Sequence, residues 1–149
     1  MDIYIIKENE TIEDVAKKFN LTVNDLLKVN DFNLYELMPG DTVNIPFILS
    51  DDFIYYEINQ GDTLRNIANN LNIGVTTLAY LNGLRINDYI YPGQRIIIPR
   101  DNVKVYITKL GDTIKDLEKN LGFSISKIIE DNPNIYLVDN QLLIEREKD

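Results

Sequence analysis

One segment indicates the fold: Tyr56-Glu57-Ile58-Asn59-Gln60-Gly61-Asp62-Thr63-Leu64. Its layout occurs three times in the chain. Thr11 and Thr113 stand at the same place in the other two occurrences. Each of these threonines has a tyrosine seven residues before it and an asparagine nineteen residues after it: Tyr4, Tyr56 and Tyr106, then Asn30, Asn82 and Asn132. Two fixed offsets in three copies indicate an internal repeat with a period of about 50 residues.

Within each copy the hydrophobic period changes from that of a strand to that of a helix. A short β-branched and aromatic run precedes a turn, Gly61-Asp62 in the second copy, where glycine readily takes a positive φ. Thr63 then precedes an apolar stripe with helical spacing: Leu64, Ile67, Ala68 and Leu71. In the other copies Thr11 with Asp14 and Thr113 with Asp116 predict a helix N-cap with a capping box.

A second start signal, at Thr22, Gly74 or Ser124, predicts a shorter helix in each copy. Its expected buried stripes are Val23, Leu26, Leu27, then Val75, Leu78, Ala79, then Ile125, Ile128, Ile129. A closing strand follows at 43–46 or 96–99 and ends at a proline, whereas 142–145 of the third copy lacks that proline. The sequence therefore predicts an α+β fold of three tandem βααβ modules, each a two-stranded antiparallel sheet covered by two helices.

The predicted boundaries follow from these elements. The modules span 1–47, 55–99 and 105–146, and the linkers span 48–54 and 100–104. The first linker is rich in apolar residues, unlike a flexible Gly/Ser linker, so we expect Phe47, Leu49 and Phe53 to pack between the first two modules.

Composition excludes several classes of function. A net charge of −9 over 149 residues disfavours binding to nucleic acid or to an anionic membrane surface. No apolar run approaches the roughly 18 residues of a membrane span. The chain has neither cysteine nor histidine, which removes the commonest metal ligands and nucleophile–base pairs, so we expect no metal, no cofactor and no catalytic residue. A glycosidase-like carboxylate pair also needs an apolar cleft that modules of about 45 residues do not offer.

The amino terminus bears on localisation. Residues 1–7 carry an acid where a secretory signal would be basic, and their apolar run is too short for a signal peptide. We expect cytoplasmic synthesis, with a spore coat, a phage particle or the cell wall as the destination if this chain is a fragment.

The second copy resembles the lysin motif (LysM) family. The resemblance rests on ordered elements, namely Gly61-Asp62-Thr63-Leu64, Ile67-Ala68, Leu81-Asn82, Tyr91-Pro92-Gly93-Gln94 and Ile98-Pro99. It extends to the first copy and, in degenerate form, to the third. The resemblance implies βααβ modules that bind N-acetylglucosamine polymers, as in peptidoglycan or chitin, without catalysis.

The family's binding groove lies between two loops, and the resemblance places it on this chain residue by residue. In the second module the implied ligand-binding residues are Gly61, Asp62, Thr63, Leu64, Ile86, Asn87, Tyr89 and Ile90. Weaker candidates in the other modules are Glu10, Thr11, Ile12, Gly111, Asp112, Thr113 and Ile114. Free backbone N–H groups at a helix start suit an acetamide carbonyl, and an exposed tyrosine suits a sugar face.

Several of these residues can also be explained by a structural role without a ligand. Thr63 fits a helix cap without any ligand, Asp62 and Asp112 fit the helix dipole, and the three repeated tyrosines fit packing. Tyr89 and Tyr91 are the best ligand candidates. An alternative function also stays open, in which the modules dock a protein partner in a bacterial assembly such as a spore coat or phage-tail baseplate. The oligomeric state is unknown from the sequence.

Overall fold

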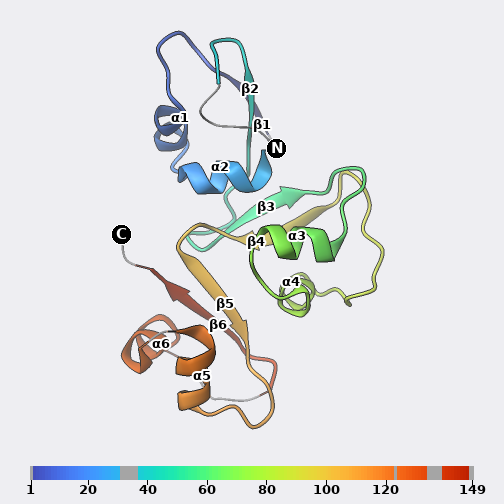
Figure 1. The fold of residues 1–149 in the computed structure, drawn as a ribbon, viewed down its shortest axis with the longest axis vertical. Coiled ribbons are helices and arrows are strands. Elements are labelled where there is room, and N and C mark those ends of the chain that lie inside the picture. Colours follow the sequence, from blue (N-terminus) through green and yellow to red (C-terminus); the bar gives the residue numbers. More distant parts are fainter. Residues whose placement is uncertain (1, 31–36, 123, 134–138, 148–149) are drawn as a thin grey trace. The chain divides into compact units, whose positions relative to one another are not determined.

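The computed structural model describes residues 2–30, 37–122, 124–133 and 139–147. Within these ranges the element order β-α-α-β occurs three times (Figure 1). The bounds are β1 Asp2–Ile5, α1 Ile12–Lys18, α2 Val23–Val29 and β2 Thr42–Ile45; β3 Phe53–Glu57, α3 Leu64–Asn70, α4 Val75–Leu81 and β4 Arg95–Pro99; β5 Val103–Ile107, α5 Ile114–Leu121, α6 Ile125–Asp131 and β6 Leu142–Arg146.

The strands of the described part form three two-stranded antiparallel sheets, β1 with β2, β3 with β4 and β5 with β6. The register is equivalent in all three, since the repeated tyrosine always faces a residue of the closing strand at the same position. The pairs are Tyr4 with Val43, Tyr56 with Ile96 and Tyr106 with Leu143. The predicted α+β class with βααβ repeats is confirmed.

The chain divides into two compact units that cut across the second repeat. One unit contains residues 1–63 and 90–101, and the other contains 64–89 and 102–149. The sheets β1-β2 and β3-β4 therefore belong to the first unit, whereas α3, α4 and the whole third repeat belong to the second. The module limits themselves stay a prediction.

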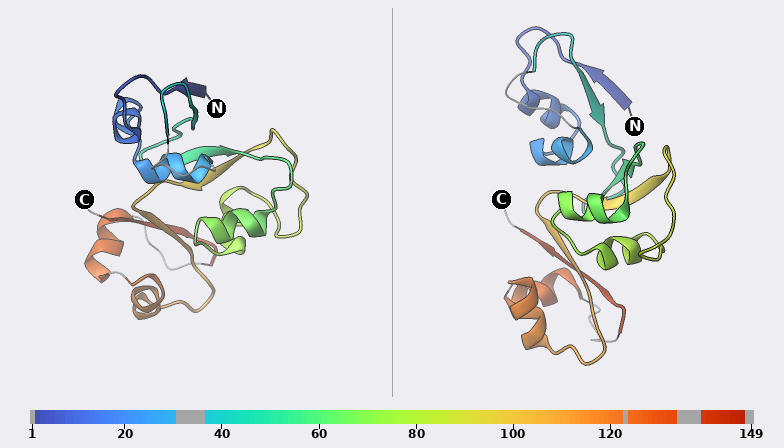
Figure 2. Two further views of the ribbon diagram at one scale, coloured as in Figure 1. Left: turned by 45° about the horizontal axis from the view of Figure 1, so that its top comes forward. Right: turned by 45° about the vertical axis from the view of Figure 1, so that its right-hand side comes forward.

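Each unit has a core that follows the predicted stripes. In the first unit α2 packs on β2, and Val15, Leu26 and Val43 have no exposed surface. In the second unit Leu117 of α5, Ile128 of α6 and Leu143 of β6 form a cluster that includes half-buried Tyr106. Both views of Figure 2 show α6 beside the β5-β6 sheet. Burial of these side chains supplies the main drive for folding, at about 1.5–3 kcal/mol each.

Two residues that were predicted to be buried are exposed. Leu27 and Ile129 are 39% and 49% exposed, because the short second helix turns a different face to the core. In α2 the buried set is Asp25, Leu26 and Val29. A fully buried carboxylate was not expected from the sequence, and its partners are described below.

The first linker also differs from the prediction. β3 begins at Phe53, and the preceding residues pair with it: the N–H of Tyr55 donates to the carbonyl of Phe47, and the N–H of Leu49 donates to the carbonyl of Phe53, both at 3.0 Å. Leu49 stays 44% exposed, so the expected packing of its side chain is wrong. Phe47 is 37% exposed, and the Arg95 guanidinium of β4 lies 4.7 Å from the centre of its ring. The backbones of both residues lie along the sheet edge. β5 begins at Val103, which lies within the predicted second linker, and the linker limits stay a prediction.

The repeated asparagine ties the end of the second helix to the closing strand. The side-chain amide of Asn30 donates to the carbonyls of Leu26 and Asn44 and accepts from the N–H of Asn44, each at 2.8 Å. Asn132 makes the same three bonds in the third repeat, at 2.8, 2.8 and 2.9 Å. Asn82 makes the equivalent helix bond at 2.9 Å. A side chain that satisfies three backbone groups at once explains why the sequence repeats it.

Candidate functional site

The loop between the first strand and the first helix of each repeat is closed by an acid. Glu10, Asp62 and Asp112 each accept a hydrogen bond from the hydroxyl of the repeated tyrosine of their own copy, at 2.8, 2.8 and 3.0 Å. Each also accepts from a backbone N–H three residues earlier, at 3.1, 2.7 and 2.7 Å. These candidate ligand residues therefore hold the shape of the loop, and the tyrosines are half-buried parts of the same arrangement.

The residue before each acid has a positive φ. Asn9 stands where the other copies have Gly61 and Gly111, and the three φ angles are 60°, 90° and 89°. Asparagine tolerates this region better than other residues with a side chain. The change from Gly-Asp to Asn9-Glu10 therefore preserves both the turn and the carboxylate that closes it.

The threonines that follow act as helix caps. Thr11 and Asp14 form a reciprocal capping box, as do Thr113 and Asp116. The N–H of Thr11 donates to the Asp14 carboxylate at 2.9 Å, and its hydroxyl does so at 2.8 Å. The predicted capping boxes are confirmed, and these two hydroxyls already have structural partners. Thr63 is exposed directly before α3.

The capping boxes predict a pH dependence. Hydrogen bonds from the N–H and hydroxyl of Thr11 lower the pKa of Asp14 below its usual 3.8, and the hydroxyl and N–H of Thr113 lower that of Asp116. A carboxylate with a depressed folded pKa stabilises the fold above its unfolded pKa, and this contribution disappears as the pH falls through the folded pKa. We expect Asp14→Ala with Asp116→Ala to lower the urea midpoint more at about pH 7 than at an acidic pH below the usual carboxyl pKa of 3.8. An equal effect at both pH values would contradict this assignment.

The second loop of the second repeat presents the most exposed candidates. Tyr89 is 76% exposed and Ile86 is 43% exposed, and Asn87 is exposed as well. Leu64 and Ile90 are only 3% and 8% exposed. At this surface Tyr89, Ile86 and Asn87 are therefore accessible to solvent, while Leu64 and Ile90 contribute to the core.

This loop is shaped by its own hydrogen bonds. The Asp88 carboxylate accepts from the N–H of Arg85 at 2.8 Å, and the N–H of Leu84 donates to the carbonyl of Ala79 at 2.8 Å. Gly83 has a φ of 64°, which lets the chain leave α4 sharply. The loop is therefore held in a defined conformation by hydrogen bonds within the chain.

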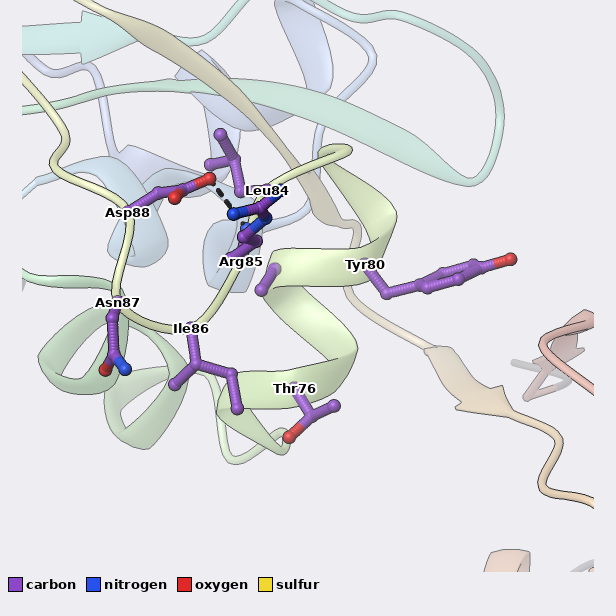
Figure 3. Close-up of a pocket in the computed structure, with 8 residues that line it drawn as sticks. Thr76, Tyr80, Leu84, Arg85, Ile86, Asn87 and Asp88 are labelled. Atoms are coloured by element: carbon purple, nitrogen blue, oxygen red, sulfur yellow. Dashed lines mark hydrogen bonds between the residues drawn. The ribbon is translucent and has the colours of Figure 1, made fainter.

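An open pocket of about 550 Å³ lies between α4 and this loop (Figure 3). Its lining mixes apolar and polar side chains: Thr76, Ala79, Tyr80, Leu84, Arg85, Ile86, Asn87 and Asp88. In Figure 3 the Tyr80 ring extends away from the other labelled residues. Only Ile86 and Asn87 were candidates from the sequence. The α4 residues were missed because Thr76 and Tyr80 belong to no motif, although their helical spacing of four places them on one face.

The other predicted residues of the groove are distributed over both units. Gly61, Asp62, Thr63 and Ile90 belong to the first unit, and Leu64, Ile86, Asn87 and Tyr89 belong to the second. The groove between the two loops therefore stays a prediction. Among the weaker candidates, Ile12 is buried and Ile114 is half-buried, whereas Thr11, Gly111 and Thr113 are exposed.

Within the described ranges, no group of three acidic side chains could hold a metal ion. No helix in the same ranges is long and apolar enough to cross a membrane.

The repeated strand–helix–helix–strand order, the capped loops and the exposed second loop define a small binding module. The LysM domain family matches residues 4–46 and 56–99, which together are more than half of the chain. The chain therefore belongs to the LysM domain family. The match contains the first two repeats, and the third repeat lies outside it.

The curated relatives named here are amidases that share only part of their length with this chain. The N-acetylmuramoyl-L-alanine amidase Sle1 of Staphylococcus epidermidis is 25% identical over 108 residues, which cover 65% of this chain and 33% of the amidase. Sle1 of Staphylococcus aureus is 25% identical over 108 residues, with 62% and 32% covered. The chain spans about a third of the length of these relatives, and the match is confined to their LysM region.

Solved structures with similarity include two larger proteins. The spore cortex-lytic enzyme SleL of Bacillus megaterium is 25% identical, with a TM-score of 0.31 and coverage of 72% of this chain and 24% of the enzyme. The LYK3 ectodomain is 15% identical, with a TM-score of 0.33 and coverage of 99% of this chain and 88% of the ectodomain.

Proposed function

We propose that this chain binds glycans that contain N-acetylglucosamine, such as peptidoglycan or chitin-type oligosaccharides, and that it does not catalyse their hydrolysis. The observation that carries the proposal is the LysM family match over residues 4–46 and 56–99. The relatives named as amidases support a cell-wall setting. LysM is a binding module, and the amidases extend well beyond the part that matches this chain.

The second module is the proposed principal site. The exposed ring of Tyr89 is able to cover a sugar face, and Asn87 is able to exchange hydrogen bonds with an acetamide or hydroxyl group. Ile86 offers exposed apolar surface to an acetyl methyl group. An acetamide that is both hydrogen-bonded and packed distinguishes N-acetylglucosamine from plain glucose polymers.

We extend the LysM assignment to the third repeat as a degenerate module. Asn132 makes the same three hydrogen bonds as Asn30, and Tyr106 donates to Asp112 as Tyr4 donates to Glu10. These interactions support a common architecture for residues 105–146. Several weak sites on one glycan strand gain affinity through effective concentration, provided that the sites can engage together.

Substitution of the exposed aromatic residue tests the site. Tyr89→Ala is expected to lower the affinity for insoluble peptidoglycan roughly tenfold, since loss of an aromatic platform removes about 1–2 kcal/mol of binding free energy. Pelleting of the chain with the polymer measures this affinity. Ile129→Ala is the matched control, because Ile129 is also exposed but lies on α6 outside the predicted groove. Binding that survives Tyr89→Ala unchanged would place the site elsewhere.

A further inference from the structure

The second helix of the first repeat and that of the second repeat each use one face to receive a later part of the chain. In the first repeat this face is formed by Asn24, Asp25 and Lys28 of α2, which contact residues 99–101. The Asp25 carboxylate accepts from the N–H of Asp101 at 2.7 Å and pairs with the Arg100 guanidinium at 3.2 Å. The Lys28 ammonium donates to the carbonyl of Pro99 at 3.0 Å. An extended segment that carries an arginine therefore covers this helix face.

The equivalent face of the second repeat is covered as well. Tyr80 holds the same helical position in α4 as Lys28 does in α2, since both are the sixth residue of a seven-residue helix. Its hydroxyl donates to the backbone carbonyl of Asn140, and α4 packs against β5. In two repeats, then, the same helix face holds a segment from further along the chain.

In the third repeat the equivalent face borders an open groove. Ser126, Lys127 and Glu130 of α6 correspond in position to Asn24, Asp25 and Lys28. With Glu145, Arg146 and Glu147 they line a cavity of about 520 Å³. The groove therefore occupies the place that residues 99–101 fill against α2.

Glu145 is the unusual residue of this groove. The strand register aligns it with Ile45 and Ile98, which are buried at the same position of the other two sheets. Glu145 is only 8% exposed, and its Oε2 is the one buried side-chain polar atom without a hydrogen-bond partner among the described residues. A buried carboxylate without a partner destabilises a fold, and isoleucine at this position would avoid the penalty.

The neighbouring cations are already paired with other acids. Lys127 lies 2.9 Å from the Asp131 carboxylate and 3.9 Å from that of Glu130, Arg146 lies 3.6 Å from Asp131, and Lys104 pairs with Glu147. Burial raises the pKa of Glu145 above its usual 4.5, with Lys104 and Lys127 opposing this rise and Asp131 and Glu147 adding to it. Among the described residues, Lys104, Lys127 and Arg146 therefore each have an acid other than Glu145 as a close partner.

We propose that the α6–β6 groove binds an extended peptide segment that carries an arginine, with Glu145 as the acceptor of its guanidinium. The segment 99–101 shows that an extended stretch can lie on this helix face. In the third repeat Lys127 stands at the position of Asp25, so the acceptor for an arginine is Glu145 of the neighbouring strand β6. Charge complementarity favours a basic occupant, because the unpartnered group of the groove is a carboxylate. This site is separate from the proposed glycan site, which lies in other loops.

The probe is a synthetic peptide with the sequence of residues 97–102, titrated into the full chain and followed by amide chemical shifts. We expect saturable shifts at residues of α6 and β6, and an affinity at least about tenfold lower for the Glu145→Gln chain and for a peptide with Arg100→Gln. The control chain Glu118→Gln, which changes an exposed acid of α5, should bind like the parent.

A second variant keeps the test independent of folding. Glu145→Ile places in β6 the residue type found at positions 45 and 98, so it should raise the thermal midpoint while abolishing peptide binding. Neither Glu145→Gln nor Glu145→Ile should alter pelleting of the chain with peptidoglycan. The proposal is overturned if the peptide gives no saturable shift with the parent chain, or if it binds the two Glu145 variants as tightly as it binds the parent.

Discussion

Arg100→Met is expected to lower the free energy of unfolding by about 3–5 kcal/mol, because it leaves the Asp25 carboxylate buried without its cation. Asp25 has no exposed surface, and the Arg100 side chain is 12% exposed. The guanidinium contacts the carboxylate at 3.2 Å and also donates to the carbonyl of Asn20 at 2.7 Å. Desolvation of an ion is tolerated only when its partners are all present.

Urea unfolding followed by circular dichroism measures this effect. The matched control is Arg95→Met, which removes an exposed ion pair with Glu57 at 3.9 Å. An exposed pair of this kind contributes about 0–1 kcal/mol. If Arg100→Met were no more destabilising than Arg95→Met, then the contact between α2 and residues 99–101 would not form in solution.

Asn30→Ala is expected to cost about 2–4 kcal/mol, because three backbone groups lose one shared side-chain partner. The affected groups are the carbonyls of Leu26 and Asn44 and the N–H of Asn44. Asn132→Ala removes an equivalent set of bonds from the third repeat and should have an effect of similar size.

Asn24→Ala is the control for this prediction. Asn24 is an exposed asparagine whose side-chain amide donates one hydrogen bond, to the Asp101 carboxylate at 3.2 Å. A change of less than about 1 kcal/mol is expected there. Chemical denaturation of the three variants gives the comparison. If Asn30→Ala lost no more stability than Asn24→Ala, then the three hydrogen bonds of the Asn30 side chain would not be needed to join α2 to β2.

The fold could be predicted because local signals agree with one another. Capping boxes at Thr11 and Thr113 fix the helix starts, and the apolar spacing that follows selects the buried face. Turn residues with positive φ, such as Asn9 and Gly61, fall where the chain leaves a strand. These interactions span only a few residues, so a single sequence contains the information needed to place them.

Interactions between distant residues could not be predicted in the same way. Asp25 was assigned no role from the sequence. Its carboxylate accepts from the N–H of Thr22 and also binds Arg100 and the N–H of Asp101, about 75 residues later in the chain. The edge pairing of Phe47 with β3 likewise uses backbone groups, which side-chain patterns do not reveal. Both differences arise from contacts whose partners lie in other elements.

The candidate site also contains residues that a local motif predicts and residues that depend on contacts between elements. The positions of Asp62 and Thr63 at the strand–helix loop follow from the motif, but the structure shows that Asp62 already bonds Tyr56. Burial separates Leu64 and Ile90 from the exposed candidates Ile86 and Tyr89, and no local pattern in the sequence indicates that separation. The pocket residues of α4 were missed because helix faces become linings only when a loop folds over them.

Co-sedimentation with insoluble peptidoglycan, and in parallel with chitin, tests the proposed glycan function most directly. The chain should appear in the pellet of at least one of the two at low and at moderate salt, and soluble N-acetylglucosamine oligomers should compete it off. Because the chain carries a net charge of −9, anionic wall polymers would repel it most strongly at low salt, so purified glycan without attached polymers is the proper substrate. A chain that stays in the supernatant with both polymers at both salt concentrations would contradict glycan binding.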